Sequence, residues 1–210
     1  AVAANLDEIY RGRLRWTSSW SLSGVAVEAM GRFVDRHPKV TPQMLPLEPD
    51  QVVDDLLQGE LDLAILTSPL DADGLEAKVL GPMPHAIYCG RDHELYGRDD
   101  VGFEELEGRR FAAPPPTPDG VFLDGWPADR PREVAMQFSQ MSVGYRACRD
   151  QGLLAVLPDL VAQDEEGLWQ LEPLPDKHDA FAIHRETLDQ PGPPQELAAE
   201  LADVIAERPD

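Results

Sequence analysis

The sequence has few cysteines and no long apolar run. Its two cysteines, Cys89 and Cys148, are too few and too far apart for a disulfide framework, and no Cys/His set has the spacing of a zinc site. No apolar run approaches the roughly 20 residues that a membrane-spanning helix needs. We therefore expect a reduced, cytoplasmic protein that has no metal, no cofactor and no membrane contact.

Positive charge is also scarce. The chain has 39 Asp and Glu against 18 Lys and Arg, which gives a net charge of −21 at pH 7, and it has no basic run. Because nucleic acids and anionic membranes attract clusters of Lys and Arg, we expect these residues to bind neither. The hydrophobic content of 42% over 210 residues is still enough for a packed core, either as one α/β unit or as two small lobes.

The sequence begins at Ala1 without a Met and without the basic and apolar regions of a signal peptide. We expect it to be a piece of a longer protein. Residues 1–11 suit the last turns of a helix that arrives from upstream and is closed by Gly12.

The first part of the chain alternates strands and helices. Leu14 to Thr17 predicts a strand, and apolar residues at three- and four-residue spacing predict a helix from Ser21 to Arg36. A strand at 40–47, a helix at 49–59 and a buried strand at 61–66 follow. Because the strand at 40–47 contains two prolines, we expect it to lie at an edge of the sheet. This β-α-β-α-β order predicts a parallel or mixed sheet with helices on both faces.

Hydroxyl side chains follow two of these strands, where ligands bind in open α/β sheets. They are Thr17, Ser18 and Ser19 after the first strand, and Thr67 and Ser68 after the third. The helix that follows Ser19 offers unpaired backbone N–H groups and the positive end of its dipole, which together favour an anion. The alternative is that Ser19 or Ser21 is only the N-cap of that helix.

The second half of the chain repeats the alternation. We expect strands at 85–89, 109–113, 133–138, 153–158 and 180–184, a helical turn at 103–106, and helices at 141–151 and 195–207. Ser139 and Ser142 follow the strand at 133–138, so a second lobe built like the first is expected. The proline-rich loop at 114–120 is more typical of a scaffold than of a catalytic loop, and 121–130 has no clear period.

Six collinear segments resemble the effector-binding domain of LysR-type transcriptional regulators: Gly12 to Ser18, Phe33 to Val40, Leu56 to Ile65, Gly74 to Leu80, Gly90 to Leu95 and Gly152 to Pro158. The resemblance implies a two-lobed, type 2 periplasmic-binding-protein fold with a hinge of two crossing strands. Lobe I would span 12–83 and 179–210, and lobe II 84–178. Residues 1–11 would end a linker helix from an upstream winged helix-turn-helix domain, through which DNA is bound.

The resemblance also implies a site for a small metabolite between the lobes and a homodimer or homotetramer in which the first helix and the second strand make contacts. The implied effector contacts are Thr17, Ser18, Ser19, Thr67, Ser68, Pro116, Thr117, Ser139 and Gln140. The sequence departs from the family pattern at Leu154, where a glycine is usual, and at 119–131, where a longer helix is usual. Arg146 is either a cation that faces the ligand or a solvated or ion-paired residue.

Other functions occur on this fold. A solute-capture protein would carry a secretion signal upstream. An enzyme would need a nucleophile beside a base or paired carboxylates, and none of the five histidines lies in a recognisable motif, so we expect no catalysis. A peroxide sensor would need a reactive cysteine and a resolving partner, whereas Cys89 and Cys148 look like small buried apolar residues.

Overall fold

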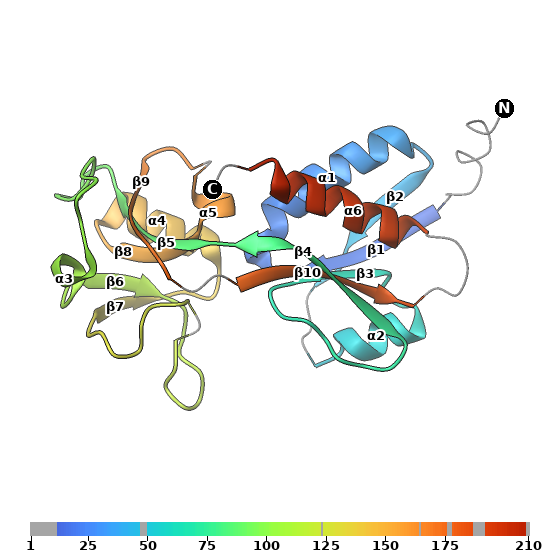
Figure 1. The fold of residues 1–210 in the computed structure, drawn as a ribbon, viewed down its shortest axis with the longest axis horizontal. Coiled ribbons are helices and arrows are strands. Elements are labelled where there is room, and N and C mark those ends of the chain that lie inside the picture. Colours follow the sequence, from blue (N-terminus) through green and yellow to red (C-terminus); the bar gives the residue numbers. More distant parts are fainter. Residues whose placement is uncertain are drawn as a thin grey trace. The chain divides into compact units, whose positions relative to one another are not determined.

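The computed structural model describes residues 12–46, 50–122, 124–163, 165–175, 178–186 and 192–208. The expected linker-helix end at 1–11 lies outside these ranges. The chain divides into two compact units (Figure 1): Ala1–Pro82 with His178–Asp210, called unit 1, and Met83–Lys177, called unit 2. No helix within the described ranges is long and apolar enough to cross a membrane.

Unit 1 is built on a five-stranded sheet. Its strands are β1 (Gly12–Ser18), β2 (Val40–Met44), β3 (Leu63–Leu66), β4 (Leu75–Met83) and β10 (His178–Arg185), in the order β2-β1-β3-β10-β4. Strand β1 runs parallel to both β2 and β3, and β10 runs antiparallel to β3. The predicted sheet is confirmed, and β2 lies at its edge as the prolines indicated.

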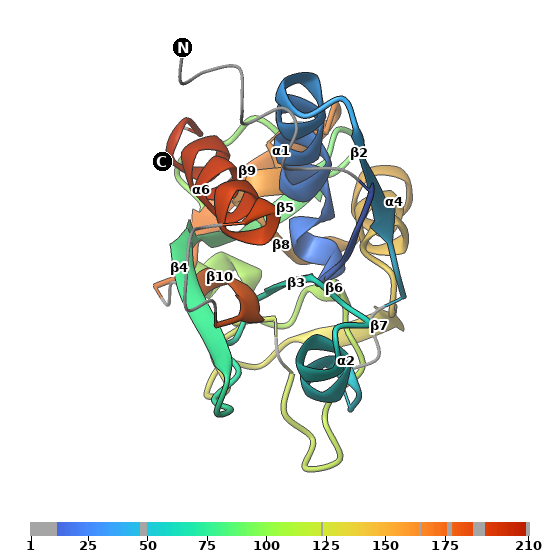
Figure 2. The same ribbon diagram turned by 90° about the vertical axis from the view of Figure 1, so that its right-hand side faces the viewer.

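Helices cover both faces of this sheet. Figures 1 and 2 show α1 (Ser23–Arg36) and α6 (Pro193–Ala206) on one face and α2 (Val52–Gln58) on the other. The predicted helix start at Ser21 is wrong, because a short 3-10 turn, η1 (Trp20–Leu22), precedes α1. The N-cap of α1 is Leu22, and no side chain caps the helix. The alternative in which a serine is the N-cap is therefore wrong as well.

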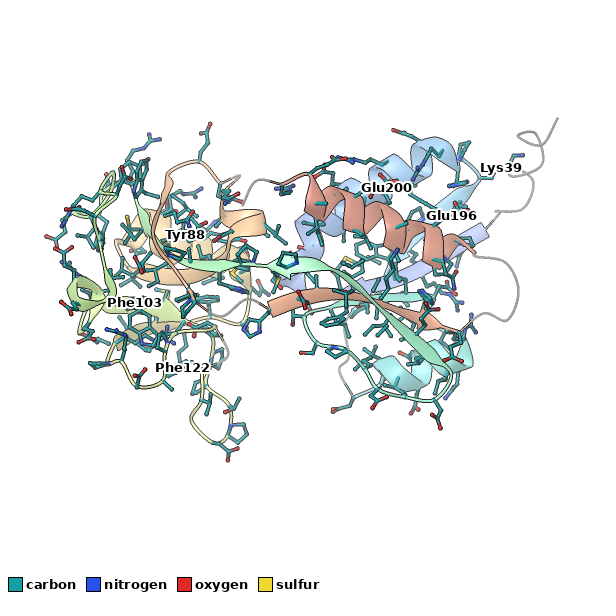
Figure 3. The ribbon with its side chains drawn as sticks, in the orientation of Figure 1. Lys39, Tyr88, Phe103, Phe122, Glu196 and Glu200 are labelled. Carbon is teal, nitrogen blue, oxygen red and sulfur yellow. The ribbon has the colours of Figure 1, made fainter. Side chains whose placement is uncertain are left out.

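Ion pairs join α1 and α6, which lie side by side in Figure 2. Glu200 of α6, labelled in Figure 3, is almost buried and contacts Arg36 and Arg32 of α1. Arg32 also pairs with Glu207 at 2.7 Å, and Glu196 lies 3.1 Å from the imidazole of His37. The two helices thus pack as one layer, and their outer charges contribute to the acidic surface.

Unit 2 contains a second five-stranded sheet. Its strands are β5 (His85–Gly90), β6 (Arg110–Ala113), β7 (Glu133–Gln137), β8 (Leu154–Pro158) and β9 (Leu168–Pro173), in the order β7-β6-β8-β5-β9. Its helices are α3 (Phe103–Leu106), α4 (Met141–Gln151) and α5 (Asp159–Ala162). Alternate residues of β5 enter two cores, with Ile87 and Cys89 on one face and Ala86 and Tyr88 on the other. The unit therefore has its own hydrophobic interior.

The two sheets share a strand order, as expected for a second lobe built like the first. In unit 2, however, β6 takes the position of β1, and β7 takes the edge position of β2. The predicted strand, hydroxyl turn and helix are present as β7, Ser139 and α4, and β7 pairs in parallel with β6 at the edge of the described sheet. Where unit 1 has α1 between these two strands, the described residues 114–122 and 124–132 of unit 2 contain no helix or strand.

A buried ion pair organises this irregular segment. The guanidinium of Arg132 donates to both carboxylate oxygens of Asp124 at 2.7 and 3.0 Å, and the two side chains are 3% and 6% exposed. The same guanidinium lies 4.7 Å from the ring centre of Phe122, which Figure 3 labels, and 5.5 Å from that of Trp126. Contacts of individual side chains stabilise this part of the chain, and it forms no described helix or strand. A helical or strand period in its sequence is therefore not expected.

Candidate functional site

Two hydroxyl-bearing segments of unit 1 meet at one edge of its sheet. In the parallel register of β1 and β3, Thr17 lies opposite Ala64 and Ser18 opposite Ile65. The backbone N–H of Ser19 donates to the carbonyl of Ile65 at 2.8 Å. The structure therefore brings the carboxyl end of β1 beside that of β3, which Thr67 and Ser68 follow. Ser19 and Thr67 are partly buried, and Ser68 is exposed.

The two buried hydroxyl groups differ in what they bind. Thr17 is 1% exposed, and its Oγ1 donates to the carbonyl of Leu45 at 3.0 Å. Ser18 is 3% exposed, and its Oγ has no hydrogen-bond partner among the described atoms. A buried polar group without a partner costs about 1–3 kcal/mol, so such a group in a native structure requires an explanation. The hydroxyl of Ser18 thus has an unused hydrogen-bonding capacity, whereas that of Thr17 already serves the fold.

The start of α1 adds a favourable field for an anion. The first turn of this 14-residue helix has no acidic residue and no side-chain cap. Its first residue, Ser23, carries a hydroxyl, but no carboxylate lies in this turn to repel an anion from the backbone N–H groups. This is notable in a chain of net charge −21. Because η1 lies between Ser19 and α1, Ser18 and Ser19 precede the helix in the chain and do not cap it.

In unit 2, the remaining predicted contacts also follow neighbouring parallel strands. Ala113 of β6 lies opposite Gln137 of β7, and the N–H of Phe138 donates to the carbonyl of Ala113 at 3.0 Å. Pro116 and Thr117 follow the first of these strands, and Ser139 and Gln140 follow the second. Their surroundings differ within unit 2, because the first two are partly buried and the second two are exposed.

Details of unit 2 limit what some of these groups can do. The Thr117 hydroxyl accepts the backbone N–H of Val121 at 3.1 Å, so it closes a short turn. Gln140 is the N-cap of α4, and its side chain does not cap the helix. Arg146 on the same helix is exposed, which agrees with a solvated residue. Of the unit 2 candidates, Thr117 is thus held by the fold, whereas Ser139 and Gln140 are exposed.

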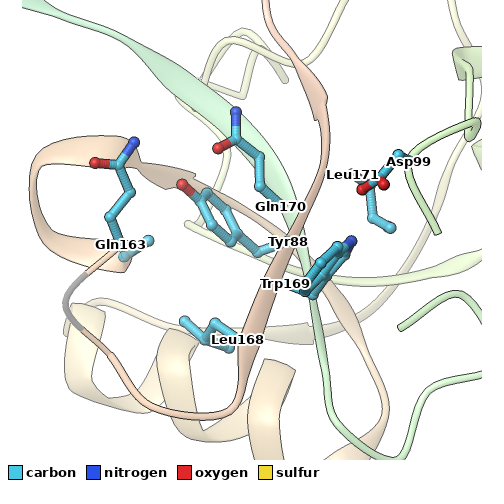
Figure 4. A pocket seen from close by; sticks show the side chains of 8 residues that line it. Tyr88, Asp99, Gln163, Leu168, Trp169, Gln170 and Leu171 are labelled. Atoms are coloured by element: carbon cyan, nitrogen blue, oxygen red, sulfur yellow. The ribbon is translucent and has the colours of Figure 1, made fainter. Parts of the chain in front are cut away.

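A separate cavity in unit 2 contains none of the predicted site residues. It has a volume of about 410 Å³ and lies beside edge strand β9. Figure 4 shows Tyr88, Gln163, Trp169 and Gln170 around it. The hydroxyl of Tyr88 donates to the buried carboxylate of Asp159 at 2.9 Å, and burial together with this carboxylate raises the pKa of Tyr88. Sequence reasoning missed the cavity because it did not define β9 as a strand.

The two cysteines are buried, as predicted. Cys89 and Cys148 are both 0% exposed and belong to different core clusters. Burial raises the pKa of Cys89 to about 12 and raises that of Cys148 as well. Because the thiolate is the reactive form, both groups are poor nucleophiles. Among the described residues, no group of three or more His, Cys, Asp or Glu could hold a metal ion.

Residues 10–206 match the family model described as the LysR substrate binding domain, and the chain belongs to this family. Among curated proteins, a stretch of 64 residues is 34% identical to the HTH-type transcriptional regulator CbbR of Cereibacter sphaeroides. That match covers 30% of this chain and 21% of CbbR, so the chain spans about a fifth of the length of this curated relative.

Solved structures of low identity share the fold. The CcmR regulatory domain of Synechocystis PCC6803, in complex with 2-PG, has a TM-score of 0.72 at 17% identity over 95% of this chain and 100% of that one. The oxidised form of OxyR has a TM-score of 0.70 at 15% identity, over 94% of this chain and 97% of that one. A sulfate-bound OxyR2 regulatory domain of Vibrio vulnificus has a TM-score of 0.70 at 16% identity, over 92% of this chain and 96% of that one.

These comparisons confirm the predicted two-lobed, type 2 periplasmic-binding-protein fold. The matched family consists of effector-binding domains of transcriptional regulators and not of enzymes. The alternative of an extracytoplasmic solute-binding protein is therefore not favoured.

Proposed function

We propose that this chain is the sensory domain of a LysR-type regulator and that it binds a small anionic metabolite at the carboxyl ends of β1 and β3. The observation that carries the proposal is the buried Oγ of Ser18, which lacks a partner among the described atoms. A ligand oxygen that accepts this hydroxyl would remove the cost of leaving it unsatisfied. Ser19, Thr67 and Ser68 supply further polar groups beside it.

The preference for an anion is supported by the start of α1. The first turn of that helix has no acidic residue and no side-chain cap, so its N–H groups and dipole favour negative charge. One similar structure, the regulatory domain of OxyR2, is sulfate-bound, and another, that of CcmR, is in complex with 2-PG. Both are regulators of the same fold.

We further propose that units 1 and 2 are lobes I and II, and that Pro116, Thr117, Ser139 and Gln140 of unit 2 also contact the effector. The hinge would be the two chain passages between the units, near 83–87 and 179–183. A ligand that binds one arrangement of the lobes or subunits more tightly than another shifts the population toward it. An upstream winged helix-turn-helix domain would convert this shift into a change in DNA binding in the cytoplasm.

We propose that the regulator forms a homodimer or a homotetramer through α1 and β2. Val27 on α1 is 61% exposed, and Met44 at the end of β2 is 51% exposed. Large apolar side chains at such exposure are typical of surfaces that a partner covers. Sedimentation of the wild type and of a Val27→Asp, Met44→Asp variant tests this. The wild type should form dimers or larger assemblies, and the variant should be monomeric.

The ligand itself can be found by a thermal-shift screen of carboxylate and phosphate metabolites. The proposal predicts that at least one anion raises the melting temperature of the wild type and that its neutral amide or ester analogue does not. If only neutral or cationic compounds stabilise the protein, the anion site is wrong. The Arg110→Gln variant, which alters an exposed arginine of unit 2, serves as a control and should respond like the wild type.

A further inference from the structure

A cavity of unit 1 lies at the opposite end of β1 from the serines. It has a volume of about 290 Å³. Its walls are the start of β1, the residue before β3, the end of β10 and the start of α6, namely Arg13, Leu14, Asp62, His184, Arg185 and Gly192 to Gln195. At about 3.3 Å per residue, Ser18 lies roughly 15 Å further along β1. None of the predicted effector residues lines this cavity.

Positive charge is concentrated here although the chain is strongly acidic. The residues that line the cavity include two arginines, Arg13 and Arg185, and one acidic residue, Asp62. That carboxylate is already neutralised by Arg15, whose side chain donates to its two oxygens at 3.1 and 3.0 Å. Arg185 is only loosely associated with it, at 3.9 Å. Both arginines of the lining are exposed, and the guanidinium of Arg185 lies beside Gly59 at the end of α2.

The remaining walls are apolar or held in place by hydrogen bonds. Leu14 is 3% exposed, and two prolines of α6 add apolar surface. His184 is 2% exposed, with Nδ1 3.0 Å from the carbonyl oxygen of Arg185 and 3.3 Å from Nε2 of Gln195. The Oε1 of Gln195 accepts the backbone N–H of Gly192 at 2.9 Å. These bonds fix the geometry of the cavity before any ligand enters.

We propose that this cavity is a second ligand site and that it takes a carboxylate with a compact apolar body. The carboxylate would accept hydrogen bonds from Arg13 and Arg185, whose planar groups suit a two-oxygen anion. The apolar body would pack on Leu14 and on the prolines Pro193 and Pro194. A pocket of mostly apolar wall with a few fixed polar groups is the usual form of a small-molecule site.

Phenylacetate is a suitable probe, and two analogues test its two halves. Phenylacetamide keeps the apolar body and loses the charge, whereas acetate keeps the charge and loses the body. Calorimetric titration of the 210-residue chain should show binding of phenylacetate and at least about tenfold weaker binding of each analogue, as expected for loss of a charge-assisted contact or of apolar burial. Absence of phenylacetate binding to the wild type overturns the proposal.

Variants locate the bound probe. The double variant Arg13→Gln, Arg185→Gln should weaken phenylacetate binding by at least about tenfold. The matched control Arg110→Gln removes an exposed arginine of unit 2, 67% exposed, and should bind like the wild type. Equal affinity of the double variant and the wild type overturns the site. If the double variant melts early, the single variant Arg13→Gln decides, since this residue is exposed and lies near the start of β1.

The two sites of unit 1 can be separated. Ser18→Ala should leave phenylacetate binding unchanged, and the NMR signals of His184 should shift when phenylacetate is added to the wild type. Loss of binding in Ser18→Ala with normal binding in the double variant would place the probe at the strand ends and contradict this proposal. The strand-end site is tested by other compounds, so failure of one site does not imply failure of the other.

Discussion

Ser18 lies opposite Ile65 in the parallel register of β1 and β3. This pairing brings two hydroxyl-bearing segments, separated by about 50 residues in the sequence, to one sheet edge. It also leaves the Ser18 hydroxyl buried without a described partner, while the hydroxyl next to it on β1 is bonded to a backbone carbonyl. Adjacent residues with the same functional group therefore have different roles.

The first prediction separates these roles by stability. Thr17→Val leaves the carbonyl of Leu45 without its donor and should lower the free energy of unfolding by about 1 kcal/mol. Ser18→Ala removes an unsatisfied hydroxyl and should leave the ligand-free protein unchanged or more stable by about 1 kcal/mol. Urea unfolding measures both. A loss in Ser18→Ala as large as that in Thr17→Val would show that Ser18 has a partner in the fold.

The second prediction concerns the buried pair in segment 114–132. Arg132→Met leaves Asp124 buried and unpaired and should cost about 3–5 kcal/mol. The double variant Arg132→Met, Asp124→Leu should recover part of that loss, because it leaves no lone charge. Arg110→Met, which affects an exposed pair with Glu133, should stay within about 1 kcal/mol of the wild type. A double variant no more stable than Arg132→Met would contradict the account.

The third prediction compares two glycines. A Cβ at Gly90 would lie 2.5 Å from the backbone oxygens of Cys148 and Arg149, which cannot move aside as a side chain can. Gly90→Ala should therefore cost at least about 1–3 kcal/mol, as overpacking does. Gly31, within α1, has nothing within 4 Å of such a Cβ, and Gly31→Ala should add about 0.5–1 kcal/mol through helix propensity. Thermal unfolding of the two variants, with shifts of opposite sign, checks this.

The fourth prediction concerns the thiols. In the folded protein the pKa of Cys89 is raised to about 12, so its thiol stays protonated where an exposed thiol, with a pKa of about 8.5, ionises. Between these values the unfolded chain releases a proton that the folded chain keeps, so stability should fall as pH rises from about 8.5 toward 12. Ellman's reagent at pH 8 should label neither cysteine until urea is added. Rapid labelling of the native protein would instead support a redox role.

Much of the fold could be predicted from the sequence, because local patterns and burial agree in it. The run Leu63–Leu66 is apolar throughout and is buried throughout. Gly59 and Gly152 end their helices with φ of 75° and 63°, which a glycine adopts without strain. The elements that were not predicted, β9 and α5, have weaker patterns in the sequence. Strand β9 is a partly exposed edge strand without alternation, and α5 has only four residues.

The candidate site was predictable to a lesser degree. The position of the hydroxyl groups at strand ends follows from the order of strands and helices. The difference between Thr17 and Ser18 depends on the carbonyl of Leu45, which is 28 residues away in the sequence, and no local pattern encodes it. The cavity of unit 1 combines four segments that approach one another only in the folded sheet.

The central claim is that the Ser18 hydroxyl binds the effector. Calorimetric titration of the first anion found by the thermal-shift screen, on the wild type and on Ser18→Ala, tests it most directly. The account predicts that the dissociation constant rises about tenfold or more in Ser18→Ala, as for a lost hydrogen bond to a charged group, with no loss of melting temperature in the free protein. Equal affinities for the two proteins would contradict it.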